Sequence, residues 1–326
     1  MKGYLPIRFF VPAATLLLII MAAALPPCSR GEPAGELIIF HAGSLAIPFR
    51  EMGRAFMKKY PRVRVLREAA GSRTSARKIR DLGKPCDIMA SADYTVIDEL
   101  LIPEFAHWNI AFATNEMAIM YRPDSAHADE INSDNWPQIL LRPGVEYGHS
   151  NPDADPCGYR TRLTWQLAEK YYRIPGLARK LDQGCPPRNI RPKETDLLAL
   201  LESGELDYLF IYRSICRQHG MPFVALPDEI NLKSASLANY YRQAAVEISG
   251  KKPGEKIVKR GKPMVYSLTI CTRSPNRAAA EAFVAFVIGP QGRRIMAQNG
   301  QPPIVPARAS GKLERLPPAL EPLLAR

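Results

Sequence analysis

Short apolar runs alternate with longer segments of helical periodicity along the first third of the chain. The apolar run at residues 37–40 precedes residues 46–60, in which apolar side chains recur at the spacing of one helix face. The same order returns twice, with strand-like runs at 63–67 and 87–90 and helix-like segments at 72–82 and 96–101. This alternation with short connections predicts an α/β fold, in which helices cover both faces of an open, largely parallel sheet.

The pattern changes after residue 110, which predicts a second structural unit. An apolar strand at residues 117–121 leaves the first sheet, and further elements are expected at 161–172, 208–212, 264–270, 278–288 and 291–298. A first lobe that is interrupted and later completed fits two lobes joined by crossing strands. We therefore expect lobe 1 at residues 36–115 and 266–310, lobe 2 at 116–265, and a loose proline-rich tail at 311–326.

The N-terminal segment has the order of an export leader. Lys2 and Arg8 precede an almost wholly apolar run at residues 9–25, and Cys28 follows two prolines. Residues 1–30 are therefore predicted to be a signal peptide or a lipoprotein leader. The protein is accordingly expected in the periplasm or on the outer face of the cytoplasmic membrane. Lipidation of Cys28, plain cleavage and an uncleaved anchor all stay open, because the apolar run nears the spanning minimum of about 17 residues.

Charge and cysteine content narrow the class of protein. The formal net charge is +12, but the basic residues are scattered and not striped between aromatic residues, which argues against a nucleic-acid partner. The six cysteines form no C-x-x-C pair and no zinc spacing. Without Cys28 an odd number remains, so at least one thiol is free or pairs between chains, and the sequence leaves any disulfide pairing open.

Two small-residue corners that carry serine are the main candidates for chemistry. Ala42-Gly43-Ser44 follows the first predicted strand, and Ala70-Gly71-Ser72 follows the second. A helix N-terminus offers unpaired N–H groups and partial positive charge, and serine adds a hydroxyl donor. Because ligands bind at the carboxyl ends of strands in such sheets, the two corners are expected to bind an oxyanion. Ordinary helix capping is the alternative role for Ser44 and Ser72.

Six segments, taken in order, resemble a known family. They are residues 41–45, 68–72, 87–94, 150–160, 191–194 and 202–208 with Tyr212 beyond them. On these segments the chain resembles the periplasmic tungstate/molybdate-binding proteins of ABC transporters, in their archaeal-type tungstate-binding branch, from about residue 36 to 308. The resemblance implies a two-lobed, type II periplasmic binding protein (a venus flytrap) with crossing hinge strands. It also implies a protein that is not an enzyme, has no cofactor, and delivers its anion to a membrane permease; we expect a monomer.

The resemblance also assigns site residues. It gives the first lobe Gly43, Ser44 and Ser72, and it gives the second lobe Asp155, Pro156, Cys157, Glu194 and Tyr212. In this branch two carboxylates approach the metal of the oxyanion, and Asp155 and Glu194 match those positions.

Residue type alone leaves simpler roles open for several of these positions. Asp155 before Pro156 also fits a helix cap, and a first-turn Glu194 also fits a helix dipole partner. Tyr212 also fits a packed aromatic, Asp153 is a rival acid, and Arg160 is expected at the surface or just outside the anion contacts.

Other functions remain as alternatives. A sulfate or phosphate capture protein would have no use for two acids, since sulfur does not accept carboxylate oxygens whereas tungsten and molybdenum do. An exported hydrolase would need a nucleophile such as Cys157 with His149 as base, but no orienting third group and no G-x-S-x-G motif is present. A ligand-sensing module of a regulator is disfavoured by the export leader. The preference between tungstate and molybdate and the protonation of the acids stay open.

Overall fold

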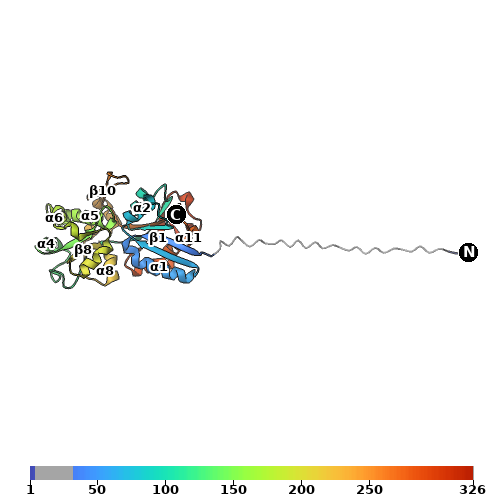
Figure 1. Cartoon of the computed structure of the whole chain (residues 1–326), viewed down its shortest axis with the longest axis horizontal. Coiled ribbons are helices and arrows are strands. Elements are labelled where there is room, and N and C mark those ends of the chain that lie inside the picture. The colour runs from blue at the N-terminus through green and yellow to red at the C-terminus, as the bar shows by residue number, and fades with distance from the viewer. Residues whose placement is uncertain (4–31, 326) are drawn as a thin grey trace. The chain divides into compact units, whose positions relative to one another are not determined.

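Two mixed sheets organise the chain in the computed structural model, which describes residues 1–3 and 32–325 (Figure 1). The predicted leader and Cys28 lie outside these described residues. Residues 33–325 belong to one compact unit. Over the part of the chain that is described, no helix combines the length and the apolar character needed to cross a bilayer.

The first sheet has six strands in the order β13-β4-β12-β3-β1-β2. Its strands are β1 (Gly35–His41), β2 (Val63–Ala69), β3 (Ile88–Ser91), β4 (Trp108–Thr114), β12 (Val265–Ile270) and β13 (Pro303–Gly311). The helices that pack on it are α1 (Ala46–Lys59), α2 (Ser72–Arg80), α3 (Tyr94–Leu100), α11 (Arg277–Ile288) and α12 (Pro290–Gln298). Together they form the first lobe, in which early and late segments of the chain lie side by side (Figure 1).

The second sheet has five strands in the order β7-β6-β8-β5-β9. Its strands are β5 (Met117–Tyr121), β6 (Tyr147–Ser150), β7 (Ile190–Arg191), β8 (Tyr208–Tyr212) and β9 (Phe223–Ala225). The helices of this second lobe are α4 (Trp136–Leu140), α5 (Pro156–Tyr171), α6 (Leu177–Gly184), α7 (Leu198–Glu202), α8 (Arg213–His219), α9 (Asp228–Asn231) and α10 (Ala238–Tyr241). A separate hairpin consists of β10 (Ala245–Ser249) and β11 (Lys256–Arg260).

Short 3₁₀ segments complete the chain. They are η1 (Gly43–Leu45), η2 (Pro187–Asn189), η3 (Glu194–Leu197), η4 (Ala235–Leu237), η5 (Leu313–Arg315) and η6 (Glu321–Leu323). Two of them, η1 and η3, contact each other although 150 residues separate Ser44 from Glu194.

The predicted α/β class is confirmed, with one difference in strand direction. β1 is parallel to β2 and β3, as the alternation predicts. However, β12 is antiparallel to both β3 and β4, and β13 is antiparallel to β4, so the sheet is mixed and not largely parallel. The sheets take their strands from residues 35–114 with 265–311 and from residues 117–225. The predicted lobe boundaries stay a prediction.

The first lobe is built around α1, whose start holds the first serine corner. Phe49, Met52 and Phe56 recur at the spacing of one helix face and are fully buried. The Phe56 ring meets the Phe283 ring of α11 edge-on at 5.1 Å between centroids. Because η1 continues directly into α1, this packing fixes the position of Ser44.

The C-terminal stretch differs from the loose tail that the proline content predicts. Leu320 is fully buried, and the backbone N–H of Ala325 donates to the carbonyl of Ala307 at 2.7 Å. Leu316, Leu323 and Leu324 also pack against the core, so this stretch lies on the first lobe.

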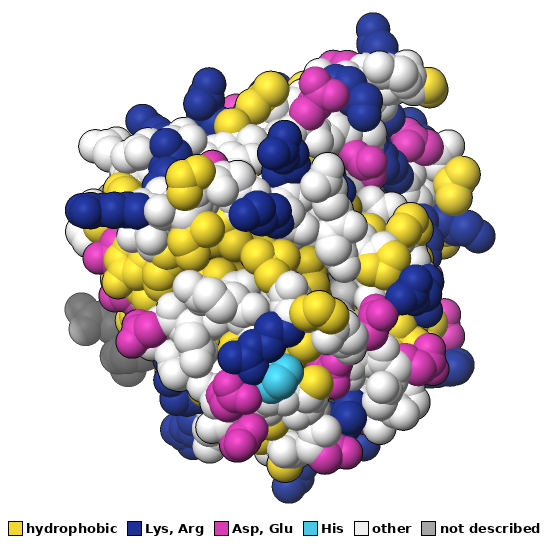
Figure 2. Space-filling model, turned by 90° about the vertical axis from the view of Figure 1, so that its left-hand side faces the viewer, with side chains coloured by type: hydrophobic (Ala, Val, Ile, Leu, Met, Phe, Trp, Pro, Cys, Tyr) yellow, Lys and Arg dark blue, Asp and Glu magenta, His cyan; other side chains and the backbone are white. Residues whose placement is uncertain are grey.

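Charge is dispersed over the face of the molecule that Figure 2 shows. On the face that carries α4 and α6, Lys and Arg side chains are spread out with Asp and Glu between them (Figure 2). A band of hydrophobic side chains also crosses this face. Dispersed charge of this kind is typical of a solvated surface and not of a nucleic-acid stripe.

Candidate functional site

The two serine corners lie at the ends of β1 and β2 and are buried. Ser44 is in η1 and Ser72 is the first residue of α2, and their side chains are 1% and 0% exposed. Neither hydroxyl caps its own helix. Instead, the Ser72 Oγ accepts from the backbone N–H of Ala92 at 3.0 Å, and the Ser44 Oγ accepts from the hydroxyl of Tyr266 at 2.8 Å. The simple capping role is therefore not what the geometry shows.

The hydrogen bonds that Ser44 and Ser72 accept leave the O–H group of each serine able to donate. The side-chain amide of Asn115 donates to the Tyr266 oxygen at 2.9 Å, and the Tyr266 hydroxyl donates a hydrogen bond to the Ser44 Oγ. A hydroxyl has one donor hydrogen and can accept as well. Since Ser44 and Ser72 both receive a hydrogen bond from a buried donor, each keeps its O–H for another partner.

Tyr212, at the end of β8, is arranged in the same way. Its ring is fully buried, and its oxygen accepts from the Arg160 Nη1 at 2.9 Å. The same nitrogen of Arg160 donates to the carbonyl of Ala92 at 2.8 Å, so Ala92 connects Arg160 to Ser72. The site therefore holds three hydroxyl groups whose oxygens are already occupied by donors.

Two acids from the second lobe complete the site. Asp155 occupies the N-cap position of α5 but makes no capping hydrogen bond; its Oδ2 accepts from the backbone N–H of Glu194 at 3.1 Å. The Glu194 Oε1 in turn accepts from the backbone N–H of Ser44, in the first lobe, at 2.6 Å. Both side chains are fully buried, and their remaining oxygens, Asp155 Oδ1 and Glu194 Oε2, lack a hydrogen-bond partner.

Gly43 leaves room for the carboxylate of Glu194. A Cβ atom at this position would lie 2.9 Å from the Glu194 Oε2 and 3.0 Å from its Oε1. The carboxylate would have to shift to make room for a side chain. The glycine therefore lets the acid take its present place at the serine corner.

Asp155 and Glu194 are unfavourable as a pair of buried charges. Burial raises the pKa of Asp155, and burial together with the charge of Asp155 raises the pKa of Glu194 well above its ordinary value. Two negative charges at this place are therefore unfavourable without a proton or a strongly positive centre between them. Over residues 1–3 and 32–325, no group of three or more His, Cys, Asp or Glu side chains is placed to hold a metal ion, so the pair stands apart from any larger ligand set.

Cys157 and His149 are hydrogen-bonded to different backbone carbonyls and not to each other, so they do not form a catalytic pair. The Cys157 Sγ donates to the carbonyl of Phe210 at 3.7 Å, and burial raises the pKa of this thiol well above its usual range. The His149 Nδ1 lies 2.7 Å from the carbonyl of Ser150, and burial lowers the pKa of the imidazole to about 4. A protonated thiol is a poor nucleophile. Pro156 begins α5, so Cys157 lies in its first turn.

The rival acid, Asp153, faces another element. Its Oδ1 accepts from the backbone N–H of Ser249 in β10 at 2.6 Å. Its carbonyl oxygen accepts from the Arg73 Nε at 3.2 Å. The structure thus brings Asp155 and not Asp153 beside Glu194.

Arg160 belongs to the inner part of the molecule and not to its surface. It is 3% exposed, and its Nη2 lies 3.9 Å from the Asp93 Oδ2, which also accepts from the Tyr159 hydroxyl at 2.6 Å. Although burial alone would raise the pKa of Asp93, the charges of Arg160, Lys262 and Lys259 hold it well below its usual value. The sequence carried one signal of this position, since Arg160 lies one helical turn after Pro156 at the start of α5.

The Arg160–Asp93 pair should contribute strongly to stability. We expect Arg160→Met to lower the free energy of unfolding at pH 7 by about 3–5 kcal/mol, because Asp93 is left buried without its main partner. The lowered pKa of Asp93 stabilises the wild type above about pH 4, so the difference should narrow below that pH. Denaturant titrations at several pH values measure this.

A matched control lies on the same helix. Arg162 pairs with Asp182 at 2.9 Å at the surface, so Arg162→Met should cost only about 0–1 kcal/mol. Equal losses for the two variants would contradict the role given to Arg160.

Comparisons with known proteins show the family to which the chain belongs. The sequence pattern of the family described as "Bacterial extracellular solute-binding protein" matches residues 37–301. The chain is 57% identical to an uncharacterized solute-binding protein of Petrotoga mobilis, over 89% of this chain and 90% of that protein. It is 37% identical to the molybdate/tungstate-binding protein WtpA of Pyrococcus abyssi, over 92% of this chain and 94% of that protein.

Solved structures show the same fold. The periplasmic molybdate-binding protein of Azotobacter vinelandii superposes with a TM-score of 0.57 at 19% identity, over 81% of this chain and 98% of that one. The sulfate-binding protein SubI of Mycobacterium tuberculosis superposes with a TM-score of 0.58 at 15% identity, over 83% and 87% of the two chains. The predicted periplasmic-binding-protein fold and the resemblance carried by the six segments are confirmed.

Proposed function

Because this chain belongs to the family of bacterial extracellular solute-binding proteins, we propose that it captures tungstate or molybdate outside the cytoplasm and delivers it to the permease of an ABC importer. The names of its WtpA relatives, at 37% identity, support this ligand class. The family and its relatives are solute-binding proteins, which favours capture over catalysis. The observation that carries the proposal is the buried pair of carboxyl groups, each with one unpaired oxygen, beside three hydroxyl donors.

The hydroxyl groups suit the oxygen atoms of the anion. Ser44, Ser72 and Tyr212 each accept a hydrogen bond from the protein and keep an O–H to donate. An oxyanion has only acceptors to offer, so hydroxyls arranged in this way are complementary to it.

The acids suit the metal of the anion and not its oxygens. A hexavalent tungsten or molybdenum centre accepts further oxygen ligands beyond its four oxo groups, so the free oxygens of Asp155 and Glu194 can complete its coordination. Sulfur in sulfate has no such capacity, and the acids would repel that anion. The same side chains therefore bind one class of oxyanion and reject another.

The burial of the site requires a conformational change during binding. Ser44 is 1% exposed, and Ser72, Asp155, Glu194 and Tyr212 are fully buried. The hydrogen bond from the Ser44 N–H to Glu194 joins the two lobes within the site. We infer that the anion enters when the lobes part and that closure then completes its coordination, as in hinge-bending binding proteins.

Calorimetric titration of the leaderless protein in oxyanion-free buffer tests the function. We expect one-to-one binding of tungstate and molybdate and far weaker binding of sulfate and phosphate, because only the first two carry a metal that the acids can coordinate. Equal binding of sulfate would keep the capture role but remove the acids from the selectivity. Absence of binding for all four anions would contradict the proposed function.

Replacement of one acid tests the origin of the selectivity. Glu194→Gln keeps the side-chain size and an acceptor for the Ser44 N–H but loses the charge. We expect the ratio of tungstate to sulfate affinity, measured by calorimetry, to fall by on the order of tenfold or more, which corresponds to about 1.4 kcal/mol.

The control for this replacement is Glu202→Gln, an exposed acid at the end of α7, which should leave the ratio unchanged. An unchanged ratio in Glu194→Gln itself would refute the coordination by this acid.

A further inference from the structure

The β10–β11 hairpin has a backbone edge that faces away from its partner strand. Its two strands are antiparallel, with the N–H of Gly261 donating to Ala244 and that of Gly250 donating to Glu255. Because hydrogen-bonded pairs alternate along such a ladder, Ala245 and Ser249 present their N–H and C=O groups to the other side. These groups are where the two lobes attach.

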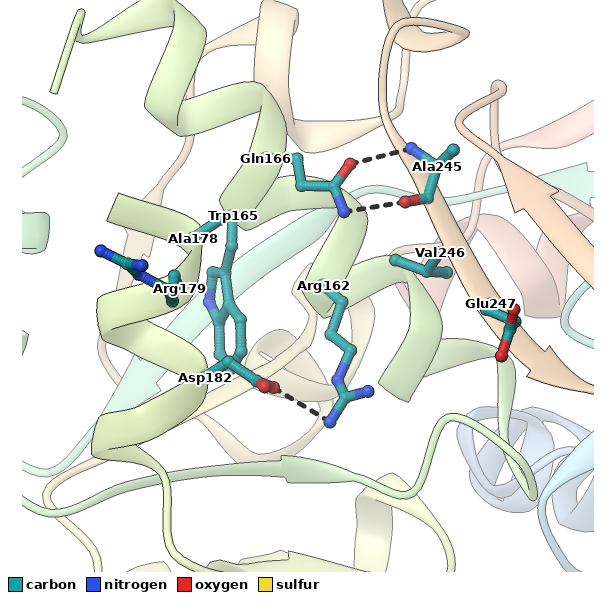
Figure 3. Close-up of a pocket in the computed structure, with 9 residues that line it drawn as sticks. All are labelled: Arg162, Trp165, Gln166, Ala178, Arg179, Asp182, Ala245, Val246 and Glu247. Atoms are coloured by element: carbon teal, nitrogen blue, oxygen red, sulfur yellow. Dashed lines mark hydrogen bonds and ion pairs between the residues drawn. The ribbon is translucent and has the colours of Figure 1, made fainter. Parts of the chain in front are cut away.

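The second lobe holds the hairpin at its beginning. The side-chain amide of Gln166 in α5 donates to the carbonyl of Ala245 at 2.8 Å and accepts from its N–H at 2.9 Å (Figure 3). The amide of Gln166 thereby takes the place of a neighbouring strand, and β10 is fixed to α5.

The first lobe holds the far end of the same strand through α2. Arg77 donates to the Oγ of Ser249 at 2.8 Å and to the carbonyl of Gly250 at 3.2 Å, and Arg73 donates to the carbonyl of Ser249. Arg77 also donates to the carbonyl of Asp153 at 3.1 Å, and the Asp153 carboxylate accepts from the Ser249 N–H. Asp153 is therefore a junction of α2, the loop before α5 and the hairpin.

The second strand of the hairpin attaches to the first lobe independently. Lys259 of β11 is 3% exposed, and its Nζ donates to the Thr95 Oγ1 at 2.8 Å and to both carboxylate oxygens of Glu99 at 2.6 Å. Both acceptors lie on α3. A buried lysine placed between two acceptors of another element is a specific contact and not a loose surface pair.

We propose that the β10–β11 hairpin is a clasp between the lobes, and that Arg77, Lys259 and Asp153 are positioning residues for anion capture. They touch the elements that present the site and not the anion: α2 begins at Ser72, and α3 follows Asp93, the partner of Arg160. The clasp holds these elements in the closed arrangement and so sets the rate at which the anion leaves. This inference rests on the proposed capture of tungstate or molybdate.

The clasp is tested by the kinetics of tungstate binding in paired variants. Arg77→Met removes two of the bonds from α2 to the hairpin together with the bond to the Asp153 carbonyl, whereas Lys78→Met, its neighbour on α2, removes only a bond to Glu68 within the first lobe. We expect Arg77→Met to raise the dissociation rate constant of tungstate on the order of tenfold with little change in the association rate constant, and Lys78→Met to change neither. A loss of stability alone would not separate the two rates in this way.

A second pair probes the other strand. Lys259→Met removes the contact with α3, and Lys256→Met removes a 4.0 Å pair with Glu247 inside the hairpin but no hydrogen bond to α3. The first should again accelerate dissociation and the second should not. If wild type binds tungstate and both clasp variants release it at the wild-type rate, the clasp is wrong while the proposed function stands.

A ligand-independent measurement decides the matter if wild type binds no tungstate or molybdate, the outcome that contradicts the proposed function. Hydrogen–deuterium exchange of the full anion-free protein should then be faster across residues 245–260 in Arg77→Met than in Lys78→Met. Equal exchange in the two variants would overturn the clasp on its own terms.

Discussion

A buried carboxyl group that crosses from one lobe to the other is the constraint on which the site depends. Glu194 accepts a hydrogen bond from the Ser44 N–H of the first lobe, and its own N–H donates to the Asp155 carboxylate. Glu194 therefore links Ser44 to Asp155. The absence of a side chain at Gly43 makes this approach sterically possible. Burial makes it electrostatically costly, since it raises the pKa of both acids. A site built in this way favours a ligand whose central atom is positively charged and whose outer atoms carry negative charge.

The rest of the architecture keeps that arrangement in place. α1 is anchored by its phenylalanine face and holds Ser44, and the Arg160–Asp93 pair fixes the turn that leads from β3 to α3. Ala92, in that turn, donates to Ser72 and accepts from Arg160, so one backbone unit links the hydroxyl of the first lobe to the charge of the second. Side chains that are not themselves among the proposed anion contacts therefore determine where the donor groups of the site lie.

Features of the fold that depend on neighbouring residues can be predicted from the sequence. Features that depend on contacts between distant segments cannot. Hydrophobic periodicity predicts α1, the parallel β1, β2 and β3, and the serine corners, because these depend on neighbouring residues. The antiparallel return of β12 and the burial of Leu320 depend on contacts between distant segments, which periodicity does not report. Residue type alone also leaves Asp155 and Asp153 equivalent. Only the fold turns one toward Glu194 and the other toward Ser249.

X-ray absorption spectroscopy at the tungsten L3 edge tests the central claim most directly, because it reports the atoms bound to the metal itself. For the tungstate complex of the leaderless protein, the account predicts the short bonds of the four oxo groups together with two longer tungsten–oxygen bonds from Asp155 and Glu194. A spectrum with only the four short bonds of free tungstate would contradict it, since the acids would then take no part in holding the metal.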